Sequence, residues 1–144
     1  MQLTTHTDYA LRLLIYLAVI KSDATLTVQD AADRYGISTN HLAKVAQSLV
    51  QQGYVTSQRG RGGGLALTHD PADINIGEVV RTIESFNLVE CFGDESMCRI
   101  ERDCLLATAL AEAREAFLQT LEQYTLADLV QPKTKLARML GRGR

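Results

Sequence analysis

The sequence has no apolar run long enough to cross a membrane, because the longest, residues 13–20, is far shorter than the roughly 18 residues that a spanning helix needs. Only two prolines occur among 144 residues, and 46% of the chain is hydrophobic, which excludes a disordered or collagen-like protein. The three cysteines are an odd number, which fits poorly with a secreted framework of paired disulfides. No basic segment precedes the apolar run and no small-residue cleavage site follows it, so we expect a soluble, cytoplasmic protein.

The net charge of −2 conceals an uneven distribution of charge. Residues 34–69 contain four basic side chains and no Asp or Glu, whereas residues 84–103 contain six acidic side chains. Residues 133–144 contain five basic side chains and no acidic one. An anionic partner responds to the local potential rather than to the sum of charges, so the middle of the chain is the part suited to face phosphate.

Hydrophobic periodicity and capping residues predict a mainly helical chain with one small hairpin. We expect helices over residues 8–20, 27–36, 38–53 and 104–124, with Thr7 as the N-cap of the first, and a further helix that begins after Asn75. Two short strands, at residues 54–57 and 65–68, flank a glycine-rich turn. We expect residues 85–103 to be irregular. The length allows one domain with a real core, or one domain plus an assembly element.

The order of three helices followed by a hairpin predicts a winged helix-turn-helix, with Gly36 in the turn between the second and third helices. The third helix is then the recognition helix. Its N-terminal end presents side chains suited to base edges and phosphates: Ser38, Thr39, Asn40, His41 and Lys44. The alternative is a helical hairpin with a solvated polar face.

The segment 59–64 predicts a wing that approaches DNA. Arg59 and Arg61 supply positive charge, and glycines such as Gly62 and Gly63 let the backbone come close to a groove. The alternative is a flexible loop. A nucleotide-binding loop is excluded because neither of its glycine motifs is present. Together with the acid-free stretch, the wing favours DNA binding.

All three cysteines, Cys91, Cys98 and Cys104, fall in one short segment, separated by six and five residues. Thiolates that bind a metal need a loop that wraps around the centre, and the spacing is wide, as for an iron–sulfur cluster, whereas structural zinc usually shows two C-x2-C pairs. One disulfide with a free thiol, or a thiol redox switch, is the alternative from spacing alone.

A cluster needs a fourth ligand, and the chain has neither a fourth cysteine nor a histidine after His69. Asp8 is a candidate if a second subunit brings it near, and four carboxylates close to the cysteines are others: Asp94, Glu95, Glu101 and Asp103. A catalytic cysteine is disfavoured because the histidines lie in the DNA-binding half, so we expect no enzyme.

Five segments together resemble the iron–sulfur winged-helix transcription regulators, and the resemblance extends to about residue 130. They are TDYALR at 7–12, STNHLAKV at 38–45, GYV at 53–55, RGRGGG at 59–64 and the three-cysteine segment at 91–104. IscR-like members of this family carry a histidine three residues beyond the last cysteine, where this chain has Ala107. The chain is therefore most similar to the nitric-oxide-sensing repressors, although six residues separate its first two cysteines where five are common.

The resemblance implies a homodimer that binds palindromic promoter DNA and releases it when nitric oxide attacks a 4Fe-4S cluster (or a 2Fe-2S cluster). Cys91, Cys98, Cys104 and Asp8 of the other protomer are the implied ligands. An IscR-like or thiol-based regulator remains the alternative, and an electron-transfer module would leave the recognition helix and wing unexplained. The expected organisation is a DNA-binding domain at 1–84, a cysteine loop at 85–104, a dimerisation helix at 105–130 and a flexible basic tail at 131–144.

Overall fold

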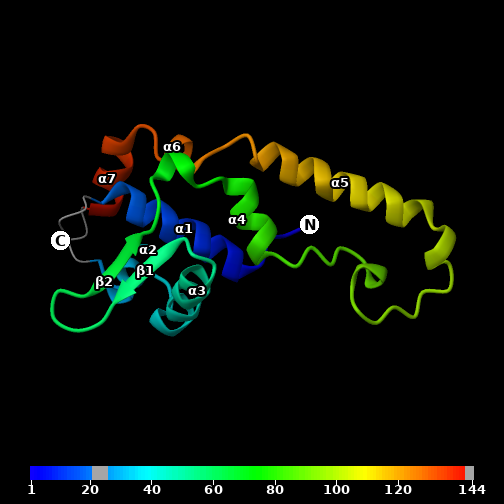
Figure 1. Cartoon of the computed structure of the whole chain (residues 1–144), viewed down its shortest axis with the longest axis horizontal. Coiled ribbons are helices and arrows are strands. Elements are labelled where there is room, and N and C mark those ends of the chain that lie inside the picture. The colour runs from blue at the N-terminus through cyan, green and yellow to red at the C-terminus, as the bar shows by residue number, and fades with distance from the viewer. Residues whose placement is uncertain (21–25, 142–144) are drawn as a thin grey trace.

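The computed structural model describes residues 1–20 and 26–141, and it is mainly helical with a two-stranded sheet, as predicted (Figure 1). The elements are α1 (Thr5–Val19), α2 (Val28–Tyr35), α3 (Thr39–Gln51), β1 (Val55–Gln58), β2 (Gly64–Leu67), η1 (Pro71–Asp73), α4 (Ile76–Ile83), η2 (Glu90–Phe92), η3 (Glu101–Asp103), α5 (Leu105–Leu121), α6 (Leu126–Leu129) and α7 (Lys133–Gly141). In this part of the chain, no helix is both long and apolar enough to span a membrane.

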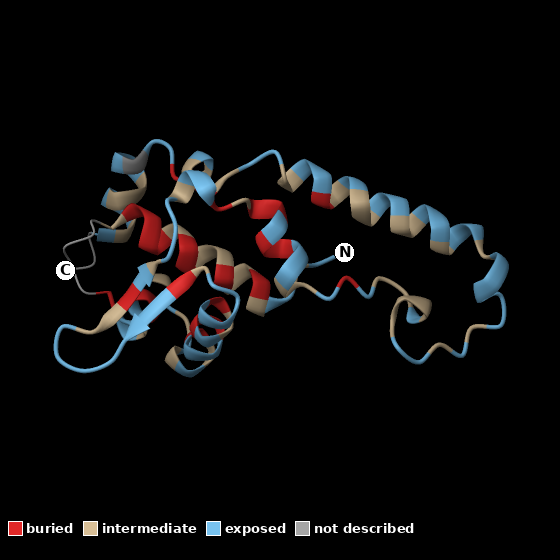
Figure 2. Cartoon of the chain, viewed as in Figure 1, coloured by how far each residue is buried: buried red, intermediate tan, exposed pale blue. Residues whose placement is uncertain are grey.

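Helix α1 runs through the centre of the body and packs against α3. Its side chains Ala10, Leu13 and Leu14 are fully buried, which fits a helix that is apolar on nearly every face (Figure 2). The prediction that Thr7 caps this helix was wrong. Thr4 is the N-cap, and its hydroxyl accepts a hydrogen bond from the backbone N–H of Thr7, which is itself buried.

Helices α2 and α3 and the hairpin form the predicted winged helix-turn-helix. Strands β1 and β2 pair antiparallel, with Val55 opposite Leu67 and Gln58 opposite Gly64. Leu26, just before α2, adds a single bridge to Leu65 of β2, whose N–H donates to the Leu26 carbonyl at 2.6 Å. The wing is therefore connected to the body at two places: β1 follows α3 along the chain, and β2 pairs with Leu26, which precedes α2.

Helix α5 is joined to the body through its C-terminal half. The side-chain amide of Asn75, the N-cap of α4, donates to the Glu122 carbonyl at 2.7 Å, and the N–H of Ile76 donates to the Tyr124 carbonyl at 3.0 Å. Leu118 is buried, whereas Leu105 and Leu106 at the other end are 84% and 63% exposed. Helix α5 and the cysteine loop thus form an arm that projects from the body (Figures 1 and 2).

The expectation of a flexible tail was wrong over the described residues, because Lys133–Gly141 form helix α7. Leu136, Ala137 and Leu140 pack against the core, and α7 contacts α1 and α2. The basic residues at the end of the sequence concealed this apolar face. Residues 142–144 of the expected tail lie outside the described part, as do residues 21–25, and the division of the chain into functional units stays a prediction.

Candidate functional site

Local capping fixes the helix-turn-helix geometry. Thr27 and Asp30 form a reciprocal capping box at the start of α2, and Gly36 ends α2 in the left-handed conformation with φ of 65°. A side chain is strained at such a φ, so glycine suits the reversal between the two helices. The hydroxyl of Ser38 then accepts from the His41 N–H and begins α3. The predicted recognition helix and its turn are therefore confirmed as structure.

Among the predicted recognition-helix residues, Ser38, Asn40 and Lys44 are exposed. The Ser38 hydroxyl caps α3, and the Thr39 hydroxyl donates to Gln29 Oε1 at 3.1 Å. The His41 ring lies against the Tyr9 ring of α1, with centroids 4.8 Å apart. Three of the five residues thus help to hold α3 in place.

The structure adds two side chains to the outer face of α3 that the sequence prediction missed. Ala43 and Gln47 are exposed and follow Asn40 at intervals of three and seven residues, which places them on one helical face. This spacing was visible in the sequence, but the prediction covered only the N-terminal end of the helix. The face that α3 offers is therefore longer than predicted.

Arg59 and Arg61 lie in the turn between the two strands of the wing, and both residues are exposed. Gly60 and Gly62 have φ of 93° and 75°, and a Cβ at Gly63 would collide with the backbone carbonyl of Gln58. The backbone geometry of the hairpin turn is therefore sufficient to explain why glycine occupies these three positions. The positive charge of the wing comes from the two arginines.

The three cysteines lie in the predicted irregular segment between α4 and α5, all partly buried and none in a disulfide. Cys91 belongs to η2, and Cys104 is the residue from which α5 begins. Burial of its thiol raises the pKa of Cys91, and the negative charges of Cys98, Glu101 and Cys104 raise it further. Without a cation nearby, the segment therefore disfavours a thiolate at Cys91.

Contacts within the loop and with α5 hold the segment around Cys91. The Glu90 carboxylate accepts from the Met97 N–H at 2.9 Å, which links the two sides of the turn between Cys91 and Cys98. The guanidinium of Arg114 on α5 lies 5.1 Å from the centre of the Phe92 ring. The loop is thus fastened to α5 beside the first cysteine.

The structure does not bring the predicted ligands together. Within residues 1–20 and 26–141, no three His, Cys, Asp or Glu side chains form a group that could hold a metal ion. Asp8 lies on α1, and both of its carboxylate oxygens accept from Arg12, at 2.9 and 2.8 Å. The carboxylates near the cysteines, Asp94, Glu95, Glu101 and Asp103, are exposed. The donor chemistry nevertheless fits an iron–sulfur cluster, because three thiols occupy one irregular segment.

Residues 3–132 match the sequence model of the Rrf2 family, described as iron-dependent transcriptional regulators. The chain belongs to the Rrf2 family. It is 49% identical over 142 residues to the HTH-type transcriptional regulator NsrR of Bacillus subtilis, with 97% of each chain covered. It is 46% identical to the regulator of the same name from Shouchella clausii, with 97% of this chain and 95% of the relative covered.

Solved structures of similar proteins agree with the Rrf2 fold. A regulator from Listeria innocua is 30% identical, with a TM-score of 0.71 over 91% of this chain and 87% of that one. T. potens IscR has a similar fold, with a TM-score of 0.72 at 23% identity over 92% of this chain and 88% of that one. The resemblance to winged-helix transcription regulators is therefore confirmed, and this Rrf2 protein is a transcriptional regulator rather than an enzyme.

Proposed function

We propose that this Rrf2 regulator is a homodimeric repressor that binds palindromic promoter DNA and senses nitric oxide through an iron–sulfur cluster. The observation that carries the proposal is the presence of three free, partly buried thiols in one loop of a chain with 46–49% identity to regulators named NsrR. The DNA-binding domain would comprise residues 1–84, the cluster loop 85–104 and the dimerisation helix 105–130.

Contact with DNA would come from the exposed end of α3 and from the wing. Asn40 and Lys44, which are exposed, would reach bases and phosphates, and the exposed Arg59 and Arg61 would reach the minor groove or the backbone. Ser38, Thr39 and His41 would hold α3 at the angle that DNA requires. The backbone at Gly62 and Gly63 would allow close approach.

Cys91, Cys98 and Cys104 would hold the cluster, with Asp8 of the other protomer as the fourth ligand. A 4Fe-4S cluster is the proposed form, and it would supply iron with which nitric oxide reacts. The chain itself provides a labile fourth position, because a carboxylate is a harder ligand than the three thiolates. Ala107 leaves no histidine at the position expected of an IscR-like site.

A cluster held by the cysteine loop of one protomer and by Asp8 on α1 of the other would couple the reaction with nitric oxide to DNA binding. Helix α1 packs against α3, and Tyr9 beside Asp8 touches His41 of the recognition helix. A dimeric helix-turn-helix protein reads half-sites about 34 Å apart, so a small change in the separation of the two α3 helices abolishes the fit. Release of Asp8 would therefore reach the DNA-binding face through direct contacts.

Measurement of iron, acid-labile sulfide and the visible spectrum on protein purified without oxygen tests the proposal. We expect about four irons and four sulfides per chain and a band that nitric oxide bleaches. Cys98→Ser should abolish specific promoter binding while helix content, followed by circular dichroism, persists. Retained promoter affinity in this variant would show that the cluster is not the switch.

A thiol-based regulator is the second candidate, since all three thiols are free and Cys98 and Cys104 lie near enough to Cys91 to raise its pKa. It predicts a protein that takes up no iron on reconstitution and forms a disulfide on oxidation. Thiol counting by mass spectrometry after oxidation distinguishes it from the cluster-based sensor.

A further inference from the structure

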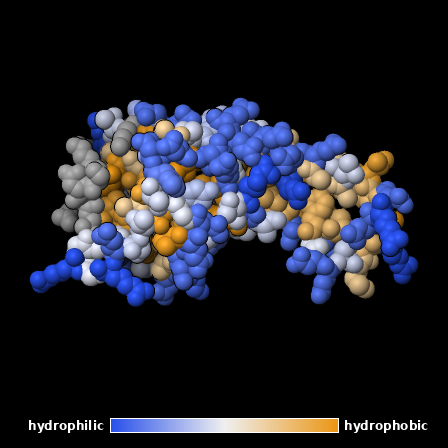
Figure 3. All heavy atoms as spheres, in the orientation of Figure 1, coloured by the Kyte–Doolittle hydropathy of each residue, from blue (hydrophilic) through white to orange (hydrophobic). Residues whose placement is uncertain are grey.

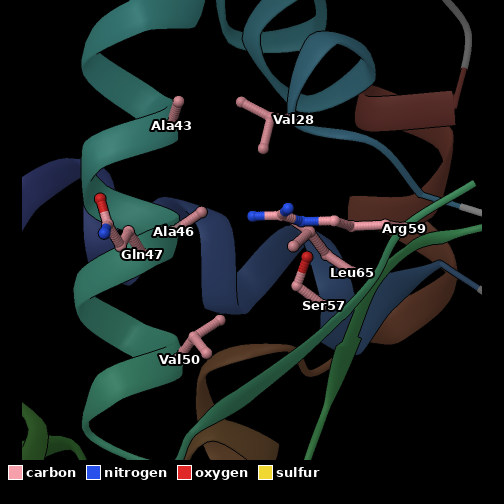
Figure 4. A pocket seen from close by; sticks show the side chains of 8 residues that line it. All are labelled: Val28, Ala43, Ala46, Gln47, Val50, Ser57, Arg59 and Leu65. Atoms are coloured by element: carbon pink, nitrogen blue, oxygen red, sulfur yellow. The ribbon is translucent and has the colours of Figure 1, made fainter.

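A groove separates the outer face of α3 from the wing (Figure 4). Its volume of about 480 Å³ lies within the roughly 300–1,000 Å³ typical of small-molecule sites. The lining side chains come from α3, from the wing and from the start of α2: Val28, Ala43, Ala46, Gln47, Val50, Ser57, Arg59 and Leu65. The groove has room for a small organic molecule.

Five of the eight side chains that line the groove are apolar, and the other three are polar or charged. Ala46 and Leu65 are buried and form its inner part, whereas Val50 is 37% exposed at its edge. Gln47 and Ser57 are the uncharged polar groups along it. A ligand with a hydrocarbon body would remove this apolar surface from water, which a fully hydrated ion would not do.

Arg59 is the single charged residue among the described lining residues, and its guanidinium extends across the groove toward α3 (Figure 4). No ion pair of Arg59 occurs within residues 1–20 and 26–141. A guanidinium matches a carboxylate with two parallel hydrogen bonds. The groove therefore combines one unpaired cation with an apolar wall.

We infer that this groove binds a small organic carboxylate with an apolar body. The carboxylate pairs with Arg59, and the apolar part lies against Ala46, Val50 and Leu65. A DNA phosphate matches the charge but not these walls. Arg59 is also a proposed DNA contact, so the bound carboxylate opposes DNA binding. This effect on DNA binding rests on the proposed function, whereas the carboxylate site does not.

Titration of the full-length protein with benzoate, followed by the methyl NMR signals of Ala43, Ala46 and Val50, tests the site. Benzamide is the uncharged matched probe, and inorganic phosphate is the anion without an apolar body. We expect saturable shifts with benzoate and affinity about tenfold lower for benzamide, which cannot form the charge-assisted hydrogen bonds to Arg59. Phosphate should leave these signals unchanged.

Two variants and one control locate the charge. Arg59→Gln and Gln47→Glu should each weaken benzoate binding about tenfold or more, the first by removing the cation and the second by adding a repulsive charge. Arg61→Gln removes a wing charge outside the groove and should leave the affinity unchanged. Equal effects of the Arg59 and Arg61 changes, or equal binding of benzoate and benzamide, would overturn the inference.

Fluorescence anisotropy of a labelled DNA duplex tests the consequence separately. Benzoate should raise the apparent Kd of the duplex for the unaltered protein and not for Arg59→Gln. Saturable benzoate binding with no effect on the duplex would leave the carboxylate site in place and refute the DNA contact of Arg59.

Discussion

Asp8 shows how a surface ion pair can keep a residue available for another partner. Its carboxylate pairs with Arg12, whose guanidinium also lies over the Tyr9 and Tyr35 rings at 5.7 and 5.9 Å. The side chains of Asp8 and Arg12 are 45% and 42% exposed, and pairs so exposed contribute only about 0–1 kcal/mol. Asp8 can therefore leave Arg12 for a stronger ligand at small cost.

Asp8→Ala should leave a folded dimer whose cluster is lost faster, because one of its four proposed ligands is removed. The decay of the visible absorption band under air measures the lifetime of the cluster. Asp94→Ala is the matched control, an exposed carboxylate inside the cysteine loop. An unchanged decay for Asp8→Ala, or a faster one only for Asp94→Ala, would move the fourth ligand to the loop.

The roles of single side chains were the least predictable from the sequence. The spacing of Ser38 to Lys44 indicated a recognition helix, but that His41 stacks on Tyr9 and Thr39 bonds to Gln29 depends on neighbours distant in sequence. The three cysteines were easy to single out by their clustering. Their arrangement with Asp8 stays a prediction, since the proposed set of ligands comes from two protomers.

At the scale of elements, the sequence predicted correctly those helix starts that depend on local capping interactions. The capping residues Thr27, Ser38 and Asn75 each begin the helix expected of them. Helix α7 was missed, and α6 was not distinguished from the helix expected at 105–130, because both depend on packing: Leu126 is fully buried and Leu136 packs against the core. Helix α6, with four residues, is also too short to give a periodic pattern.

The crossing of α4 and α5 requires glycine at position 77. A Cβ there would lie 2.6 Å from the backbone nitrogen and 2.8 Å from the Cα of Glu122. Gly77→Ala should lower the free energy of unfolding by about 1–3 kcal/mol, because the clash outweighs the gain in helix propensity. Urea denaturation measures the change. Gly141→Ala, where a Cβ meets nothing within 4 Å, is the control and should leave stability unchanged.

The wing should contribute to DNA binding through charge. Arg59→Ala and Arg61→Ala should each weaken binding to many sequences and lower the slope of log K against log salt by about one for each phosphate that is no longer neutralised. Binding isotherms at several salt concentrations measure the slope. Arg102→Ala, an exposed cation in the cysteine loop, is the control. Equal slopes in all four proteins would show that the wing does not touch phosphate.

Over the whole molecule, the projecting arm leaves an apolar surface exposed among the residues that the structure describes. Large hydrophobic side chains gather at its far end (Figure 3), and the exposed ones there are Met97, Ile100, Leu105 and Leu106. The sequence predicted a dimerisation helix over residues 105–130. In the structure only part of this helix is available to a partner, since Phe117 and Leu121 pack against the core of their own chain.

The exposed part of α5 should support dimerisation, and Leu106→Asp tests this. Leu106 is 63% exposed in the single chain, so the change should cost the folded protomer little. Burial of a charge without a partner at a dimer interface is costly, and we expect the dissociation constant of the dimer to rise about tenfold or more. Sedimentation equilibrium measures this dissociation constant.

Met139→Asp is the matched control, because Met139 is an apolar side chain 71% exposed on α7, outside the arm. A dimer of unchanged affinity in Leu106→Asp, or equal weakening by the control, would place the interface elsewhere. Weaker dimerisation with retained cluster content would in turn oppose Asp8 of the other protomer as a ligand, because that ligand can be supplied only by an assembled dimer.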